Sequence, residues 1–192
     1  MRRTLVVMVK SARPGRVKTR LGHDIGMVPA AWWFRHQTRA LLRRLADPRW
    51  RIVLAVSPDR DVLARHWPPH LTRRAQGGGD LGRRMLAQLA AAPRGHVCLI
   101  GADLPDLRRQ HIARAFAVLG GHDLVFGPAL DGGFWLIGAG MLRPARGALD
   151  GVRWSSEHAL ADSLTALRRH RVALTDRLAD VDTVADLARF SR

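Results

Sequence analysis

The chain has 192 residues, of which 47% are hydrophobic, and this length fits one domain that can bury a real core. It contains no run of about 18 apolar residues, and Met1-Arg2-Arg3 leads directly into a patterned strand without a small-residue cleavage site. We therefore expect a cytoplasmic protein without a membrane partner. Cys98 is the only cysteine and lies in an apolar run, so we expect a small buried hydrophobic residue and no internal disulfide.

The formal net charge is +16, and a charge of this size often indicates a nucleic-acid partner. The distribution of the charge argues against that interpretation, because arginines occur in nearly every predicted helix and loop and form no lysine-rich tail or aromatic stripe. A positive field also concentrates small anionic substrates, including nucleotides. Nucleotide binding is therefore favoured, and a non-catalytic nucleic-acid-binding protein stays as an alternative.

The first informative segment is a buried strand followed by a basic loop. The run Leu5–Val9 is apolar and rich in β-branched residues, which predicts the strand. Gly15, in a Pro-Gly turn, lets the backbone approach a bound group closely. Lysine occurs only here, where a compact ammonium suits a phosphate, so a solvated basic loop is the less favoured alternative. We assign five residues of the loop to nucleotide binding: Lys10, Arg13, Gly15, Lys18 and Arg20.

The rest of the chain alternates between predicted helices and strands, as in an open α/β sheet. An Asp-Gly-Gly turn between apolar runs, beginning at Asp131, predicts a hairpin. Asp182 or Thr183 is expected to cap the final helix. Helices are predicted over residues 29–45, 57–66, 81–92, 109–119 and 155–169, and extended segments over 50–57, 71–75, 96–101, 123–126 and 172–174.

A glycine-rich run at residues 77–82 formally matches the G-x-G-x-x-G dinucleotide fingerprint. We reject this motif because the preceding stretch, LTRRAQ, is not a hydrophobic strand and no acidic strand tip follows about twenty residues later. The glycines instead give a backbone-rich surface that suits a flat base or sugar. We assign Gly79 and the adjoining Asp80 to the nucleotide-binding surface.

The second informative segment follows the predicted strand HVCLIG. Ligands of open α/β sheets bind beyond the carboxyl ends of the strands, so Asp103 should share a crevice with Lys18 and Arg20. A carboxylate opposite basic groups suggests a divalent cation held by Asp103 and by substrate phosphates. The alternative is that Asp103 caps the helix starting near Leu107, although Asp106 is better placed for that role.

Two further groups of residues are candidates for the site. Asp131 and its two glycines precede aromatic residues, which is a surface on which a sugar or an acceptor could lie. Trp154 fits either the core or a stacking wall. Known motifs for P-loop hydrolysis, zinc proteolysis, paired-cysteine metal sites and serine esterases are absent from the sequence.

Taken together, the motifs resemble those of the DUF2064 family, and the resemblance covers nearly the whole chain. The motifs are K-x-x-x-P-G-x-V-K-T-R-L from Lys10, G-D-L-G-x-R-M from Gly79, G-A-D-L-P from Gly101, G-P-A-x-D-G-G-F from Gly127, W-S at Trp154 and D-x-D-T-x-x-D-L from Asp180. That family is similar to nucleotide-diphospho-sugar transferases of the GT-A fold and includes arsenosugar-biosynthesis glycosyltransferases. It also looks like a relative of guanylyltransferases that activate phospholactate for a deazaflavin cofactor.

The resemblance implies a three-layer α/β/α GT-A fold with a mostly parallel central sheet, nucleotide in the N-terminal half and acceptor toward the C-terminal half. Carried over residue by residue, Lys18 and Arg20 would hold the diphosphate and Asp103 would be the metal carboxylate. Asp182 is the candidate second ligand for Mg²⁺ or Mn²⁺, with Asp180 as the alternative. The sequence has Arg83 where an acidic residue is common, so residue 83 receives no role.

The leading hypothesis is a metal-dependent glycosyltransferase that uses a nucleoside-diphosphate-sugar donor and a small-molecule acceptor. The cation, Lys18 and Arg20 would stabilise the charge that develops on the leaving diphosphate. Asp131 is the candidate base for the acceptor hydroxyl if the reaction inverts configuration. The alternative is a nucleotidyltransferase that uses a nucleoside triphosphate and releases pyrophosphate. The sequence leaves the donor base, the sugar, the acceptor and the oligomeric state open.

Overall fold

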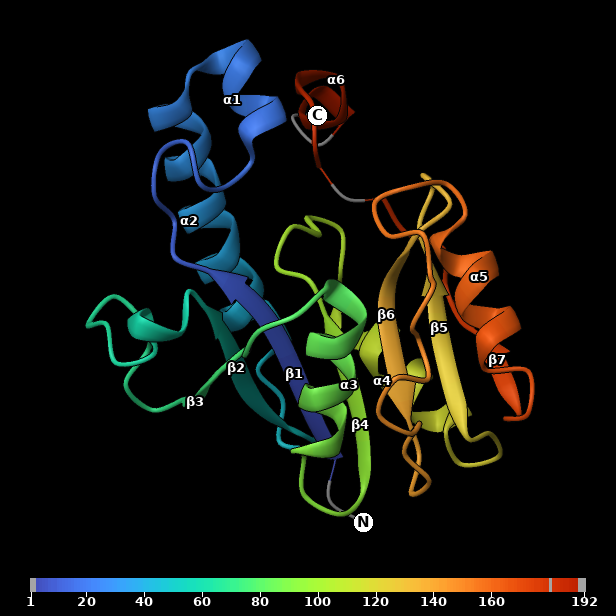
Figure 1. Ribbon diagram of the computed structural model, residues 1–192. Helices are drawn as coiled ribbons and strands as arrows, with labels where there is room; N and C mark the ends of the chain where they lie inside the picture. Colours follow the sequence, from blue (N-terminus) through green and yellow to red (C-terminus); the bar gives the residue numbers. More distant parts are fainter. Residues whose placement is uncertain (1–2, 180, 190–192) are drawn as a thin grey trace.

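The computed structural model describes residues 3–179 and 181–189, and its described part is built on a seven-stranded sheet in the order β3-β2-β1-β4-β6-β5-β7 (Figure 1). The strands are β1 (Arg3–Lys10), β2 (Arg51–Ser57), β3 (Thr72–Ala75), β4 (His96–Ile100), β5 (Leu124–Pro128), β6 (Phe134–Ala139) and β7 (Val172–Leu174). The helices are α1 (Thr19–Ile25), α2 (Met27–Leu45), α3 (Leu81–Ala90), α4 (Arg109–Val118), α5 (Ala159–Ala166) and α6 (Val184–Arg189), with a short 3₁₀ helix η1 (Asp59–Asp61).

The sheet is mostly parallel, as predicted. Strand β1 pairs in parallel with β2 on one side and with β4 on the other, and β3 and β7 extend the sheet in parallel with β2 and β5. Among the described strands, only β6 runs antiparallel to its neighbours, β4 and β5. After β1 the chain first forms β2 and β3 on one side of β1 and then forms β4 on the other side of β1. The carboxyl ends of β1 and β4 therefore flank a crevice of the kind that binds ligands in open α/β sheets.

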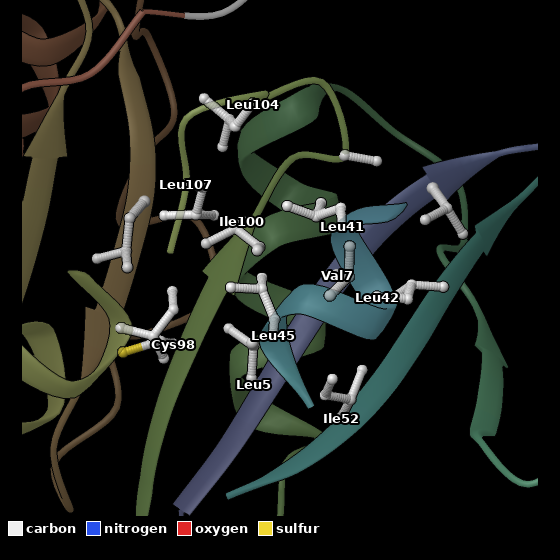
Figure 2. Packing of buried hydrophobic residues seen from close by; sticks show 14 of the residues in the cluster. Leu5, Val7, Leu41, Leu42, Leu45, Ile52, Cys98, Ile100, Leu104 and Leu107 are labelled. Carbon is white, nitrogen blue, oxygen red and sulfur yellow. The ribbon is translucent and has the colours of Figure 1, made fainter. Parts of the chain in front are cut away.

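Helices cover both faces of the sheet, which explains the unbroken apolar run of β1. Leu5 and Val7 pack in one cluster with residues of α2 and α4, and Figure 2 shows this cluster beside α2. Val6 points to the other face and packs in a second cluster with residues of α3. Figure 1 shows α3 in front of the sheet and α4 behind it. Cys98 is fully buried in the first cluster, as predicted.

Two expectations about helices were wrong, and one helix was not foreseen. The segment expected to be helical through His66 forms only the three-residue η1, and the indole N–H of Trp67 donates to the carbonyl of Asp61 at 2.9 Å to close the following turns. Helix α5 is shorter than the expected 155–169 segment: Ser155 has φ +58° and cannot be part of a right-handed helix, the next three residues form a bend and a turn, and the helix ends at Ala166. Helix α1 was not predicted, and it begins directly after Lys18.

The expected hairpin and the expected cap of the last helix are both present. The N–H of Ala129 donates to the carbonyl of Gly133 at 3.0 Å, which closes the turn between β5 and β6. Thr183 Oγ1 accepts from the N–H of Asp186 at 3.2 Å, so Thr183 caps α6. Helix α4 begins at Arg109, too far from Asp103 for that residue to cap it, and its N-cap residue is Arg108, not Asp106. None of the described helices combines the length and the apolar character that crossing a membrane requires.

Candidate active site

A cleft of about 610 Å³ lies beyond the carboxyl ends of β1 and β4. Its walls come from the loop after β1, the start of α3, the segment after β4, strand β6 and the segment before α6. The charged residues among those lining it are five basic side chains and two carboxylates, namely Lys10, Arg16, Lys18, Arg20, Arg84, Asp103 and Asp182. A cleft with this excess of positive charge is suited to a ligand with several phosphate charges.

Lys18 is the central side chain of the cleft. Its Nζ donates to Asp103 Oδ2 and to Asp182 Oδ1, each at 2.6 Å, and only 6% of the side chain is exposed. Burial alone would lower the pKa of Lys18, but the charges of the two aspartates and their hydrogen bonds outweigh it and raise the pKa above its ordinary value. Lys18 is therefore an ammonium at neutral pH.

The three members of this ion-pair group come from distant parts of the chain. Lys18 has φ +45° at the junction between the basic loop and α1, Asp103 follows β4, and Asp182 precedes α6. The N–H of Val181 donates to the carbonyl of Asp103 at 3.3 Å, and the N–H of Val184 donates to the carboxylate of Asp24 at 3.3 Å. These two backbone contacts hold the C-terminal segment against the cleft.

Two further features shape the surroundings of the aspartates. Arg20 Nη1 lies 3.6 Å from Asp182 Oδ2, although 73% of the Arg20 side chain is exposed. A Cβ at Gly101 would lie 2.9 Å from Asp103 Oδ1, so a larger residue there would push against the carboxylate. Glycine at position 101 therefore leaves room for the carboxylate of Asp103.

The donor chemistry fits a hard divalent cation held jointly with phosphates. Carboxylate oxygens are the protein ligands of Mg²⁺, which commonly takes only one or two of them and completes its shell with water and substrate phosphates. Among residues 3–179 and 181–189, no group of three or more His, Cys, Asp or Glu side chains could hold a metal. The two carboxylates that could bind a cation together with substrate phosphates are Asp103 and Asp182, once the ammonium of Lys18 moves away from them. Asp180, the alternative ligand, lies outside the described residues.

The other residues that were predicted to bind the nucleotide fall into two groups. Lys10 and Arg20 line the cleft together with Lys18. Four others lie outside its lining, namely Arg13, Gly15, Gly79 and Asp80. Arg13 Nη2 instead donates to Asp61 Oδ1 at 2.8 Å and to Oδ2 at 3.0 Å. The Arg13 side chain lines a separate pocket of about 230 Å³ beside α2. Asp80 caps α3 by accepting from the N–H of Arg83 at 2.8 Å.

Sequence reasoning missed Gln76 and Arg84, which also line the cleft. Gln76 is buried, and its Nε2 donates to the carbonyls of Val9 and Ala55 at 3.0 and 2.9 Å, which ties the ends of β1 and β2 to the chain after β3. Its Oε1 accepts from Arg84 Nη1 at 3.3 Å. The one available signal was the position of Gln76 directly after the short strand and before three glycines.

A second pocket of about 200 Å³ adjoins the cleft and shares Asp103 with it. Asp131 lines this second pocket, and its Oδ1 accepts from the N–H of Gly133 at 2.9 Å. Phe134 and Trp154 form its aromatic wall, with ring centroids 6.2 Å apart and planes at 70°. Trp154 also packs against the second core cluster and closely over Gly82, so it is both a core residue and a wall residue.

Comparisons with known proteins support the same architecture. The model of a family described as uncharacterized proteins conserved in bacteria (DUF2064) matches residues 40–156. No curated protein matches the sequence. A crystal structure from Desulfovibrio desulfuricans, described as a candidate nucleotide-diphospho-sugar transferase, is 32% identical, covers 100% of this chain and 87% of its own, and superposes with a TM-score of 0.89.

Two more distant structures share the fold alone. Rv0371c from Mycobacterium tuberculosis, solved in complex with manganese, is 18% identical over 99% of this chain and 98% of its own, with a TM-score of 0.55. A CMP:2-keto-3-deoxy-manno-octonic acid synthetase solved with CTP is 12% identical over 98% of this chain and 96% of its own, with a TM-score of 0.58.

Proposed function

The chain belongs to the DUF2064 family of conserved bacterial proteins, and we propose that it is a metal-dependent glycosyltransferase that takes a sugar from a nucleoside diphosphate and transfers it to a small acceptor. The observation that carries the proposal is the contact of Lys18 with both Asp103 and Asp182 at the edge of a strongly basic cleft. The 32% identical structure described as a candidate nucleotide-diphospho-sugar transferase supports the choice of donor.

The chemistry requires stabilisation of the leaving diphosphate. The bond between the anomeric carbon and the diphosphate oxygen breaks, the electron pair stays on that oxygen, and the acceptor oxygen forms the new bond to carbon. Lys18 and Arg20 supply positive charge where this negative charge grows, in a cleft whose lining has an excess of basic side chains. A divalent cation on Asp103 and Asp182 would add Lewis-acid stabilisation of the same charge.

Asp131 is the proposed base that receives the proton of the acceptor hydroxyl. It lies in the pocket next to the cleft, on the tight turn between β5 and β6. The N–H of Gly133 donates to one oxygen of the carboxylate and thereby fixes the orientation of the side chain. Asp131 Oδ2 makes no hydrogen bond to any side chain or backbone group of the described chain, so it is available to an acceptor.

The first experiment is a thermal-stability screen of nucleoside diphosphates, triphosphates and nucleotide sugars with Mg²⁺ and with Mn²⁺, the cation found in the Rv0371c structure. We expect stabilisation by a nucleoside diphosphate that depends on the cation. In the Asp103→Asn variant the fold should persist and the cation-dependent part of the stabilisation should disappear. Unchanged cation dependence in that variant would remove Asp103 from the metal site.

Nucleotidyl transfer is the second candidate, and the five basic side chains of the cleft favour it because they could also hold a triphosphate. The same fold holds CTP in the distantly related synthetase. The two reactions release different products. Incubation with a nucleotide sugar should release a nucleoside diphosphate if the chain is a glycosyltransferase, whereas pyrophosphate release from a triphosphate would support nucleotidyl transfer instead.

A further inference from the structure

We propose that the second pocket, which the lining residues Asp103, Asp131, Phe134 and Trp154 define, admits an uncharged or amine-bearing hydroxyl compound with an apolar face and rejects acceptors that carry phosphate or carboxylate. This inference rests on the proposed transfer reaction and specifies the class of its acceptor. The pocket volume of about 200 Å³ suits a group the size of one sugar ring.

The position of the pocket makes it the place for the second substrate. It shares Asp103, Met85 and Ser155 with the large cleft, so a ligand in it would lie beside the proposed metal and diphosphate. The carboxylate of Asp131, at the turn between β5 and β6, lines this pocket but not the large cleft. A hydroxyl group of a bound acceptor would therefore lie between its base and the leaving diphosphate.

The wall of the pocket offers apolar surfaces. Phe134 packs edge-to-face against Phe126 at 4.9 Å and against Trp154 at 6.2 Å, which fixes both rings. The indole N–H of Trp135 already donates to the carbonyl of Asp176 at 2.8 Å, so this buried residue presents only its apolar surface. The flat apolar face of a sugar or an aromatic ring is a suitable partner for such a wall.

The charge of the pocket is opposite to that of the rest of the molecule. Within the described chain, the residues that line it include two carboxylates and no Lys, Arg or His, although the net charge of the sequence is +16. Two arginines adjoin lining residues in the sequence. Arg153, before Trp154, is bound by both oxygens of Asp162 at 2.8 and 2.9 Å, and Arg84, before Met85, donates to Gln76 Oε1 in the large cleft.

None of the described residues that line this pocket could pair with a bound phosphate or carboxylate, which would lie against Asp131, and this arrangement is unfavourable. Lys18, in the adjoining cleft, is already paired with Asp103 and Asp182.

The experiment compares four probes of similar size: benzyl alcohol, benzylamine, benzoate and benzyl phosphate. Binding is measured by ligand-observed NMR with the large cleft filled by inorganic pyrophosphate and Mg²⁺, so that anionic probes do not report on the basic cleft. We expect benzyl alcohol and benzylamine to bind at least about tenfold more tightly than the two anions. Their binding should be lost in Trp154→Ala.

A second variant tests the charge argument without removing the wall. Leu81 lies at the start of α3, where the pocket meets the large cleft, and lines both; it is 36% exposed, so it can be replaced without opening the core while pyrophosphate and Mg²⁺ fill the cleft. Leu81→Arg should bring benzyl phosphate to an affinity equal to or better than that of benzyl alcohol, and the matched Leu81→Gln should not.

The outcomes separate this inference from the proposed reaction. Equal binding of anions and alcohol by the unmodified protein, or no binding of alcohol and amine, would overturn the inference about the pocket. Because binding is measured without turnover, a failure to find glycosyl transfer would count against the proposed reaction alone. The order of the four probe affinities would still decide which acceptors the pocket admits.

Discussion

Lys18 Nζ lies 2.6 Å from Asp103 Oδ2 and 2.6 Å from Asp182 Oδ1, so one ammonium occupies the position between the two carboxylates proposed to bind the metal. A divalent cation and an ammonium do not share this position, because their repulsion at about 4 Å amounts to roughly 2–8 kcal/mol at effective dielectric constants of 80 to 20. Metal entry therefore requires Lys18 to move, and a bound diphosphate offers it a new anionic partner. Metal and nucleotide should bind cooperatively.

The variant Lys18→Met tests this exchange. We expect Mn²⁺ to bind it at least about tenfold more tightly than the unmodified protein when no phosphate ligand is present, because the competing charge has gone. Pyrophosphate should bind more weakly, since a phosphate contact is lost. Electron paramagnetic resonance of free Mn²⁺ measures the first quantity and calorimetry the second.

Lys10→Met is the matched control, since it removes the only other lysine of the chain and Lys10 also lines the cleft. It makes no ion pair with Asp103 or Asp182 in the structure, so Mn²⁺ binding without phosphate should change far less than in Lys18→Met. Weaker Mn²⁺ binding in Lys18→Met would contradict the exchange.

Gln76 provides a prediction about stability. Replacing it with Leu leaves the buried carbonyls of Val9 and Ala55 without their donor, at a cost of about 1–3 kcal/mol in the free energy of unfolding. Arg84 also loses its contact with Gln76 Oε1. Urea denaturation measures the loss of stability, and pyrophosphate binding should weaken as well. An unfolding free energy equal to that of the unmodified protein would refute the role assigned to Gln76.

The sequence predicted the central part of the fold. It also predicted that Lys18 lies near Asp103, but not that Lys18 contacts Asp182 as well. Strands β1, β2 and β4 are buried on both faces, so they appear in the sequence as apolar runs that periodicity detects. The rule that ligands bind beyond the carboxyl ends of such strands then placed Lys18 and Asp103 in one cleft, as the structure finds them.

The rest could not be predicted because it depends on packing between distant segments. Asp182 reaches Lys18 only because Val181 and Val184 tie the C-terminal segment to Asp103 and Asp24, contacts that no local pattern signals. Arg13 lies on the same basic loop as Lys18 but pairs with Asp61. The chain has twice as many basic as acidic residues. The tertiary structure therefore decides which arginine forms an ion pair with each carboxylate.

Gly132 provides a prediction that separates the second pocket from the large cleft. It has φ +84°, and a Cβ there would collide with the backbone of Glu157, so Gly132→Ala must shift the turn that carries Asp131. We expect a stability loss of about 1–3 kcal/mol and weaker binding of benzyl alcohol, with pyrophosphate binding retained. Calorimetry on the folded variant measures both ligands.

Gly78→Ala is the control for this change, because a Cβ at Gly78 would meet no atom of the described chain within 4 Å apart from its own sequence neighbours. Its stability and both affinities should stay close to those of the unmodified protein. If Gly132→Ala lost pyrophosphate binding and kept benzyl alcohol binding, the division of the site into two pockets would be wrong.

The ion pair of Arg153 with Asp162 predicts how stability responds to acid. The Arg153 side chain, followed by its backbone N–H, holds the pKa of Asp162 below its ordinary value of 3.8 in the folded protein. A carboxyl group with a lowered pKa stabilises the fold at pH values above its unfolded pKa, and this contribution is lost as the pH falls through the folded pKa. Asp162→Asn should therefore lower the Tm at pH 5–7 by a constant amount, and the gap should narrow progressively as the pH falls from about 4 to about 2.

Thermal denaturation of both proteins between pH 2 and pH 7 measures this gap. Asp106→Asn is the control, because Asp106 is exposed and lies 3.8 Å from Arg108, a surface pair that is expected to contribute little to stability. Arg153 directly precedes Trp154, so Asp162→Asn should also weaken benzyl alcohol binding at neutral pH. A gap in Tm that widens toward low pH would mean that Asp162 stabilises the fold in its protonated form, contrary to the ion pair in the structure.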